Sequence, residues 1–319
     1  RACSEIRRQD REASWDLAFL FTCGEFNAHF ESIAAVIRQE LSLENLIGCT
    51  AEAVLGVAQE VEDEPAISLM TLQTNGRWLP LHLDFVRSAD GGSIVGWPDD
   101  WLDQWPSDPQ IVLLADPFTF PTDLLLQTAN DDHPGARIFG GMASGGARPG
   151  DNRLAIGTSV CSEGAVGVAF LDSPWTSVVS QGCRPIGQPL VITKVEANVI
   201  YELGGLPAHD QLMNIYESLP NQEKLLAQKG LHLGRVVDEY MEEFSPGDFL
   251  IRNVIGVSRE ENSVSVGDYM RVGQTVQFHL RDAKSADMDL RQSLRTASTG
   301  VAPNEVNLRM DRASRSEGF

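Results

Sequence analysis

The order of strands and helices near the N-terminus restricts this chain to a mixed α/β fold. An apolar strand is predicted at residues 15–22, a helix at 27–41 with apolar residues at three- and four-residue spacing, and a second strand at 46–52. Strands of one sheet that are joined through a helix run parallel, with a right-handed crossover. We therefore expect a β-α-β unit here.

The same order returns further along the chain. Buried strands are predicted at 111–115 and 138–141, with a helix at 121–129 between them. This recurrence indicates an internal duplication. It rests on three pairs of landmarks at offsets of 93, 92 and 97 residues, which are Leu20 with Leu113, Ile47 with Phe139 and Ser68 with Ala165.

Two further strands are expected after each β-α-β unit. Apolar and polar residues alternate at 66–72 and 78–85 on both sides of Asn75-Gly76, which predicts a hairpin. Strands at 165–171 and 176–181 follow the second unit. The N-terminal domain is therefore expected to be a duplicated β-α-β-β-β unit with mixed sheets.

The pattern changes past Pro189, where shorter strands and helices follow without the β-α-β order. This predicts a smaller α+β domain. The last residues lack apolar periodicity, so we expect a poorly ordered tail. The expected organisation is an N-terminal domain of residues 1–194, a C-terminal domain of residues 195–295 and a tail of residues 296–319.

A glycine-rich turn follows the strand at 138–141. Residues 137–146 contain four glycines and one serine. Glycine permits positive φ and exposes main-chain N–H groups, which suits an anion or a carboxylate. A tight turn without any ligand explains the same composition.

Ligands of open α/β sheets bind outside the carboxyl ends of parallel strands. In the duplicated unit, the turns at residues 23–24, 49–50, 116–117 and 141–146 share that edge. We therefore expect one crevice there. In it, the amides of 140–146 would hold an anionic group while Cys49, Thr50 and Asp116 shape the pocket.

Arg184 is a second candidate for ligand binding. It lies between Cys183 and Pro185 in a turn, where its guanidinium could clamp a carboxylate with two hydrogen bonds. An ion pair with one of the 45 acidic residues is the alternative.

Cys49 and Cys183 each lie next to a glycine and near a turn, so either could act as a nucleophile if its pKa were lowered. Small buried side chains are the more common role of such cysteines. A cysteine-dependent hydrolase or transferase therefore remains an alternative function.

Composition excludes several classes of partner. With a formal net charge of -20, the chain lacks the clustered Lys and Arg that bind nucleic acid or an anionic membrane. The longest apolar runs are too short to span a bilayer. An odd number of cysteines, five, and a polar N-terminus favour a reduced, cytoplasmic location. The histidine and cysteine spacings match no metal site, and no phosphate-binding glycine motif is present, so no cofactor is expected.

Several of these stretches together resemble the FIST family, whose N and C modules occur in prokaryotic signal-transduction proteins and in a eukaryotic F-box protein. The N module resembles residues 46–52 (Leu-Ile-Gly-Cys-Thr-Ala-Glu), 114–118, 139–145 and 180–187, and the C module resembles residues 247–253 and 272–282. Two departures are noted. The opening strand expected before Arg1 is absent, and the glycine-rich segments that continue the C module are not found after Leu294, so a truncated C module is expected.

The resemblance implies a sensory domain of signal transduction that binds a small polar metabolite, such as an amino acid or a carboxylate. The resemblance implies no catalytic activity. It does imply a downstream signalling protein as partner. A protein-interaction platform without a small ligand is the other alternative. The ligand-binding residues that we expect are Gly48, Cys49, Thr50, Glu52, Asp116, Gly140, Gly141, Ser144, Gly145, Gln181, Cys183 and Arg184.

Overall fold

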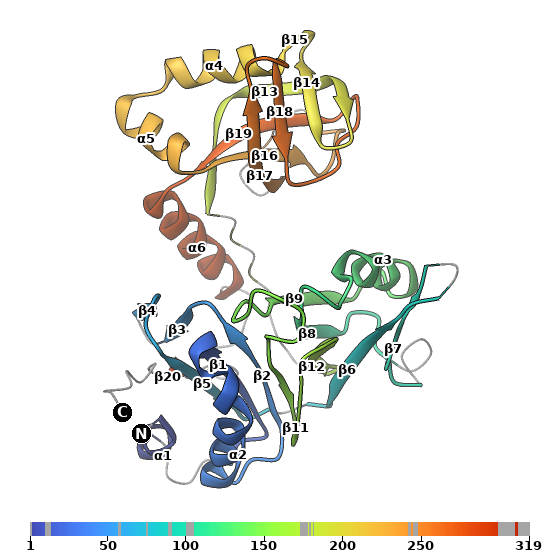
Figure 1. Cartoon of the computed structure of the whole chain (residues 1–319), viewed down its shortest axis with the longest axis vertical. Coiled ribbons are helices and arrows are strands. Elements are labelled where there is room, and N and C mark those ends of the chain that lie inside the picture. The colour runs from blue at the N-terminus through green and yellow to red at the C-terminus, as the bar shows by residue number, and fades with distance from the viewer. Residues whose placement is uncertain are drawn as a thin grey trace. The chain divides into compact units, whose positions relative to one another are not determined.

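The computed structural model divides the chain into two compact units (Figure 1). Unit 1 comprises Arg1–Trp175 with Asn304–Phe319, and unit 2 comprises Thr176–Pro303. The structure describes residues 2–9, 14–56, 59–74, 76–88, 91–99, 105–172, 178, 180, 182–241, 244, 248–298 and 310–311. The expected tail therefore lies almost wholly outside the described residues.

The first sheet of unit 1 contains the first β-α-β unit. Strand β1 runs parallel to β2 and antiparallel to β5. The connection from β1 to β2 passes through η1 (Gly24–His29) and α2 (Phe30–Leu41). The strand order is β11-β10-β2-β1-β5-β20. The bounds are β1 Leu17–Cys23, β2 Leu46–Ala51, β5 Ile67–Leu72, β10 Leu154–Ile156, β11 Ser159–Cys161 and β20 Met310–Asp311.

The second sheet repeats this arrangement. Strand β8 runs parallel to β9 through α3 (Thr122–Asp132), and it runs antiparallel to β12. The strand order is β7-β6-β12-β8-β9. The bounds are β6 Trp78–Val86, β7 Ser93–Val95, β8 Gln110–Ala115, β9 Arg137–Met142 and β12 Ala165–Phe170. Both predicted β-α-β units and the mixed sheets are thus confirmed.

The predicted hairpin at Asn75-Gly76 is wrong. Its two strands, β5 and β6, belong to different sheets, because β5 pairs with β1 and β6 pairs with β12. A turn signal reports only the local reversal of the chain, whereas the sheet that a strand joins depends on distant partners. The strand expected at 176–181 falls mainly outside the described residues.

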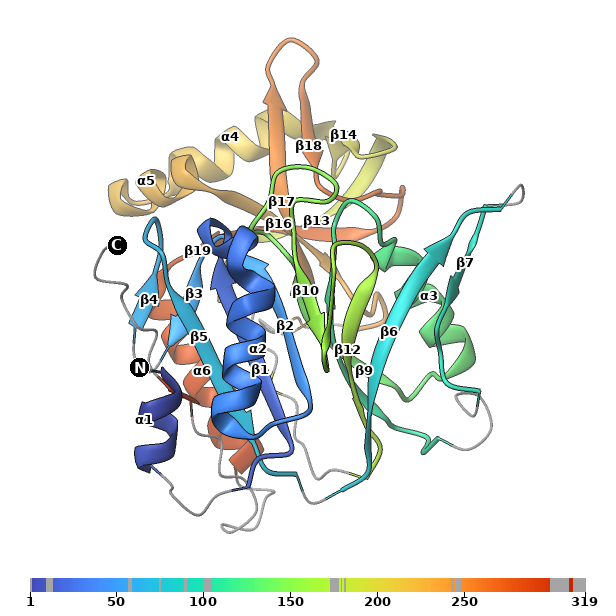
Figure 2. The ribbon, with the colours of Figure 1, turned by 60° about the horizontal axis from the view of Figure 1, so that its bottom comes forward.

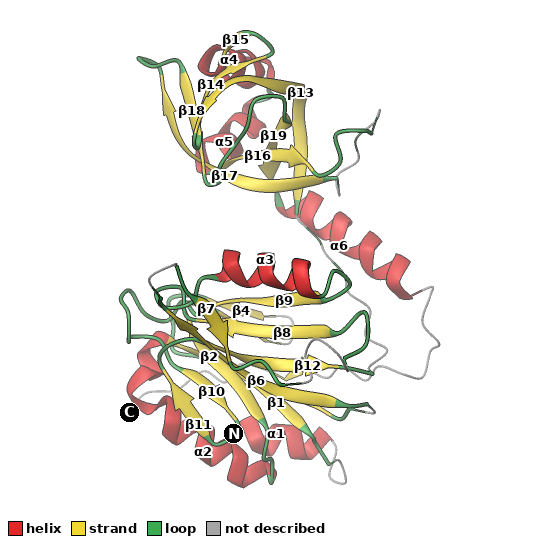
Figure 3. Cartoon of the chain, turned by 90° about the vertical axis from the view of Figure 1, so that its right-hand side faces the viewer, coloured by secondary structure: helices red, strands yellow, loops and turns green. Residues whose placement is uncertain are grey.

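Unit 1 has four layers. Phe19 and Ile47 of the first sheet meet Leu114 and Val166 of the second sheet in a buried cluster between them. On the outer face of the first sheet lies α2, with α1 (Ala2–Gln9) beside it, and on the outer face of the second lies α3. Figure 2 shows α2 across β1 and β2, and Figure 3 shows α3 along β8 and β9. A short ribbon, β3 (Val54–Gly56) with β4 (Gln59–Val61), completes unit 1.

Amphipathic spacing places α2 on its sheet. Phe30, Ala34, Ile37 and Leu41 recur every three or four residues and are buried against Leu20 and other residues of the first sheet. Burial of a side chain the size of phenylalanine or leucine contributes about 1.5–3 kcal/mol. The helix is therefore held by its apolar face, and it ends at Ser42 in the left-handed conformation.

Glycines occupy matching positions in the two parallel strand pairs. Gly48 of β2 lies opposite Leu20 of β1, and Gly140 of β9 lies opposite Leu113 of β8. A Cβ atom at either glycine would collide with the main-chain oxygen of the opposite leucine. Both strands therefore require glycine for the close approach of their backbones.

Unit 2 is an antiparallel, barrel-like sheet with order β13-β19-β16-β17-β18-β14-β15, closed by pairing of β13 with β14. Helices α4 and α5 contribute Leu212 and Leu226 to its apolar core. The residue 194 boundary that we expected lies within β13. The bounds are β13 Cys183–Glu196, β14 Val199–Leu203, β15 Leu206–Pro207, α4 Ala208–Ser218, α5 Asn221–Lys229, β16 Leu231–Val236, β17 Phe249–Ser258, β18 Ser263–Val266, β19 Thr275–Arg281 and α6 Ala283–Ser298.

Candidate functional site

The glycine-rich loop after β9 folds onto the carboxyl end of β2. The amides of Ser144 and Gly145 both donate to the carbonyl oxygen of Thr50, over 3.1 and 3.2 Å. The Ser144 hydroxyl oxygen accepts a hydrogen bond from the amide of Glu52 over 3.0 Å. Four of the residues expected in the site therefore lie together, and two amides of the expected anion cradle are already bound within the protein.

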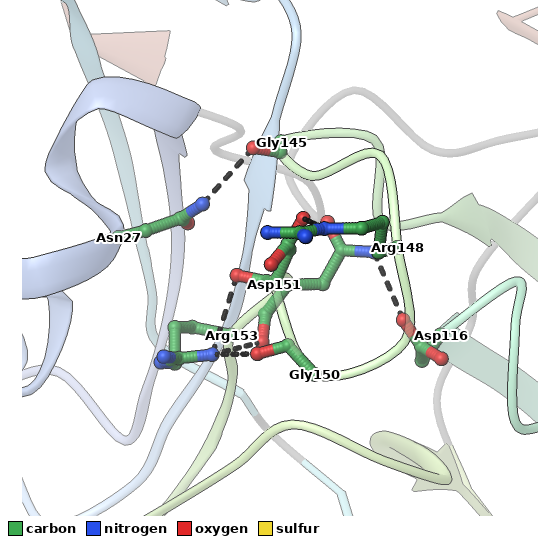
Figure 4. A network of polar contacts seen from close by, with 8 residues as sticks. Asn27, Asp116, Gly145, Arg148, Gly150, Asp151 and Arg153 are labelled. Atoms are coloured by element: carbon green, nitrogen blue, oxygen red, sulfur yellow. Dashed lines mark hydrogen bonds and ion pairs between the residues drawn. The ribbon is translucent and has the colours of Figure 1, made fainter.

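Gly145 is required for this contact. A Cβ atom there would lie 2.7 Å from the Cβ atom of Thr50, closer than side chains approach. The carbonyl oxygen of Gly145 accepts a hydrogen bond from Asn27 Nδ2 over 3.0 Å, so η1 also holds the loop (Figure 4). Both β2 and η1 therefore hold the loop, at the carboxyl ends of the parallel strands of the first sheet.

The return of the loop to β10 is fixed by Thr50 and Arg153. Their main chains are joined by the Thr50 amide, which donates to the Arg153 carbonyl, and the buried Thr50 hydroxyl accepts from the Arg153 amide, both over 3.0 Å. The Arg153 guanidinium donates to three successive carbonyl oxygens, those of Gly150, Asp151 and Asn152. Figure 4 shows this guanidinium beside Gly150 and Asp151. The loop has one defined shape.

Asp116 directly follows β8, and its carboxylate is fully buried. It accepts hydrogen bonds from Asn152 Nδ2 (2.9 Å), the Phe118 amide (3.1 Å) and the Thr119 hydroxyl (2.8 Å). Three donors make the burial of a charged carboxylate tolerable. Asp116 therefore connects the end of the second sheet to the loop that closes the first.

Asn152 is a polar residue that the sequence analysis missed. Its side chain is fully buried, and its Oδ1 atom has no hydrogen-bond partner among the described residues. Burial of an amide oxygen without a partner costs about 1–3 kcal/mol. Its only signal in the sequence is its position six residues after the glycine-rich turn, in a segment without periodicity.

Cys49 lies in the apolar cluster between the two sheets. Burial raises the pKa of its thiol to about 12, so the nucleophilic thiolate is almost absent at neutral pH. Gly48 lies beside it within β2 and faces Leu20. Both predicted residues are therefore part of β2, and the Cys49 thiol is not activated as a nucleophile.

Gly140 and Gly141 border a separate cavity of about 200 Å³. It lies between α3 and the strands β8 and β9, and its lining is mainly apolar. The remaining lining residues are Leu113, Ala115, Thr122, Leu125, Leu126, Ile138, Phe139 and Met142.

Two predicted residues, Cys183 and Arg184, lie in unit 2, and Gln181 lies outside the described residues. The Arg184 guanidinium is paired with Asp282 (3.0 Å) and Glu223 (2.9 Å). The pKa of Asp282 is lowered, mainly by the Ser285 amide that donates to it and further by Arg184. Arg184 therefore joins β13 to α5 and to the residue that precedes α6.

Within the described part of the chain, no three His, Cys, Asp or Glu side chains are grouped so that they could hold a metal ion. No helix in that part has the length and apolar character needed to cross a membrane.

Two family models match this chain, and the boundary between them lies within unit 2. The FIST N domain model matches residues 16–206, and the FIST C domain model matches residues 210–317. The uncharacterized protein Rv0628c of Mycobacterium tuberculosis is 39% identical over 266 residues, which cover 83% of this chain and 68% of that protein. The uncharacterized protein Mb0898c of Mycobacterium bovis is 39% identical over 274 residues, which cover 85% of this chain and 70% of that protein.

Proposed function

Because the chain belongs to the family of proteins with FIST N and FIST C domains, which are associated with sensory roles in signal transduction, we propose that it senses a small polar metabolite. The metabolite, such as an amino acid, binds in unit 1 at the carboxyl ends of the parallel strands. The polar residues that we assign to this strand-end site are Thr50, Glu52, Asp116, Ser144 and Asn152.

The buried Oδ1 atom of Asn152 is the observation that carries the proposal. A buried acceptor without a partner is rare in folded proteins, and a ligand that donates an N–H group would satisfy it. The Asp116 carboxylate, hydrogen-bonded to the same side chain, adds negative charge beside it. An amino group therefore fits this site better than a carboxylate, since the amides of Ser144 and Gly145 are occupied.

Thr50 and Arg153 hold the loop from both ends. Because Asn152 Oδ1 is fully buried, the ligand reaches it only when the residues that cover it move aside. The hydrogen bond between Ser144 and Glu52 fixes the exposed rim of the loop.

We also propose that unit 1 arose by internal duplication. The two β-α-β units have the same strand arrangement, and the pairs Leu20–Gly48 and Leu113–Gly140 stand at equivalent register positions, 93 and 92 residues apart. This relationship supports one ancestral unit, used twice to build the two sheets.

Unit 2 is assigned a structural or signalling role in this proposal. Arg184 forms ion pairs with Asp282 and Glu223, so it stabilises unit 2, and we assign ligand binding to unit 1. A downstream signalling protein and a cytoplasmic location remain part of the proposal, and the five free cysteines support the latter.

Isothermal titration calorimetry with a panel of the amino acids and their decarboxylated amines tests the proposal. A binder should be weakened at least about tenfold by Asn152→Ala, since a buried hydrogen bond to a charged group contributes about 1.5–3 kcal/mol. Asn198→Ala is the matched control, because it removes the same type of side chain in unit 2. There the Asn198 side-chain Nδ2 donates to the Val266 carbonyl oxygen.

Two results would overturn the proposal. One is the absence of any binder in the panel, which would favour a protein-interaction platform. The other is equal affinity in wild type and Asn152→Ala, with melting curves that show both proteins folded.

A further inference from the structure

We infer that the cavity between α3 and β9 is a binding site for a compact apolar group, such as a branched aliphatic chain or a phenyl ring, of a small ligand. The inference deepens the proposed function and rests on it, because it names the second half of the ligand. We call this cavity the α3–β9 pocket.

The size of the α3–β9 pocket fits one group. Its volume of about 200 Å³ exceeds the roughly 150 Å³ of an apolar cavity that binds benzene. It is smaller than the roughly 300–1,000 Å³ that hold a drug-sized ligand. The pocket therefore accommodates a side chain or a ring, and the rest of the ligand lies outside it.

The walls select for apolar chemistry. Leu113 and Ala115 of β8, Leu125 of α3 and Ile138 of β9 line the pocket. Leu113, Ala115 and Leu125 belong to one buried cluster, so the pocket continues the core of the second sheet. A charged group there would lose its hydration without gaining a partner.

Gly141 of β9 leaves open space beside the pocket, and Gly140 lets β9 approach β8 closely. Gly140 has φ of +140°, and a Cβ atom there would collide with the Leu113 carbonyl oxygen. At Gly141, by contrast, a Cβ atom would meet no atom within 4 Å. The strand therefore runs past the pocket without side chains at two successive positions.

The mouth of the pocket is apolar and accessible. Leu126 and Met142 line it, and each is 42% exposed. Met142 Sδ accepts a weak hydrogen bond from the Thr122 hydroxyl over 3.5 Å, which joins the start of α3 to the end of β9. Methionine adapts its shape to different partners, so a ligand can cover these two side chains.

The pocket and the polar strand-end site both draw residues from the ends of β8 and β9. Ala115 lines the pocket and Asp116 follows it, while Met142 lines the pocket and Ser144 lies two residues on. The Ala143 amide donates to the Ala115 carbonyl over 2.8 Å, which ties the two strand ends together. The ligand class that combines both sites is a small amine with a compact apolar group.

Ligand-observed NMR with toluene, L-leucine, L-phenylalanine, L-alanine and L-aspartate as probes tests the inference. Saturation transfer is expected for toluene, leucine and phenylalanine, and only background for alanine and aspartate. Leu126→Asp should weaken toluene binding at least about tenfold, because the new carboxylate lies in the mouth of an apolar site. Gly141→Leu, which adds volume beside the pocket, should weaken it as well.

Val36→Asp is the matched control, since Val36 is an exposed apolar residue of α2 in the same unit, 55% exposed. It should leave toluene binding unchanged. Equal toluene binding in Leu126→Asp and wild type, or no binding of any apolar probe to the folded protein, would overturn the inference.

The same probes separate the inference from the proposed function. Toluene has no amino group, so its binding should not respond to Asn152→Ala. If toluene binds in the pocket but no amine does, the pocket stands and the proposed function fails. If an amine binds and Leu126→Asp does not weaken it, the apolar half of the ligand is wrong and the strand-end site stands.

Discussion

His232 of β16 and His279 of β19 lie directly opposite each other in the antiparallel ladder of unit 2. Both are almost fully buried, with 8% and 1% of their surface exposed. His279 Nδ1 is 2.9 Å from the Gln277 carbonyl oxygen, and its ring meets that of Phe249 edge to face. His232 Nδ1 and His279 Nε2 have no partner among the described residues.

This pair should make the stability of unit 2 depend on pH. Burial lowers the pKa of both histidines; Arg281 lowers that of His232 further, and His232 lowers that of His279. An unfolded histidine has a pKa of about 6.5, so just below that pH the unfolded chain binds more protons than the folded one. The free energy of unfolding should therefore fall as the pH drops below about 6.5.

Urea unfolding between pH 5 and 8 checks this prediction. His279→Phe, which keeps a ring against Phe249, should flatten the pH dependence. His82→Asn, at a histidine whose side chain is 43% exposed, is the control and should leave it unchanged. A dependence that is the same in all three proteins would contradict the assignment.

Gly140→Ala should destabilise unit 1 by about 2–4 kcal/mol, because a Cβ atom collides with the Leu113 carbonyl oxygen and the residue has positive φ. Gly141→Ala is the neighbouring control. Its Cβ atom meets nothing within 4 Å, so the change should stay within about 0.5 kcal/mol. Chemical denaturation of the two variants side by side measures the difference, and equal stabilities would show that β9 is not held as described.

Cys49 should resist alkylation in the folded protein. With a pKa of about 12, on the order of one thiol in 100,000 is ionised at pH 7, and the side chain is 3% exposed. Mass spectrometry after treatment with iodoacetamide should find Cys3 and Cys161, which are half-buried, modified before Cys49. Rapid and selective labelling of Cys49 would instead support the alternative function, a cysteine-dependent hydrolase or transferase.

Arg184→Met should lower the stability of unit 2 by about 1–2 kcal/mol, because it leaves Asp282 and Glu223 without their shared cation. Arg77→Met is the control. Arg77 pairs with Asp172 at an exposed position, where solvent screens an ion pair and its contribution to stability is small. Thermal unfolding of both variants distinguishes them, and an Arg184→Met protein as stable as wild type would leave the ion pairs without a structural role.

The fold was predictable where periodicity is local. The spacing of Phe30, Ala34, Ile37 and Leu41 predicts α2, and a helix between two strands predicts their parallel pairing. The destination of β6 was not predictable, because the Asn75-Gly76 signal says nothing about which sheet the next strand enters. The barrel-like closure of unit 2 also depends on distant pairings such as that of β13 with β19.

The candidate site was predictable where it depends on strand ends. The rule that turns at the carboxyl ends of parallel strands share an edge anticipates the contact of Thr50 with Ser144 and Gly145. Asn152 and Asn27 could not be found this way, since single polar residues in loops carry no periodic signal. Nor does the sequence tell which of 45 acidic residues neutralise Arg184.

The two sheets of unit 1 exchange strands. Within residues 1–175 of unit 1, β6 lies in the first half and, with β7, completes the second sheet, whereas β10 and β11 lie in the second half and extend the first sheet. Neither half is therefore an autonomous folding unit, even if both descend from one ancestor. β6 can pair with β7 as soon as both are made, but its pairing with β12 has to wait for the synthesis of residues 165–170. Such long-range closure favours slow, all-or-none folding of unit 1.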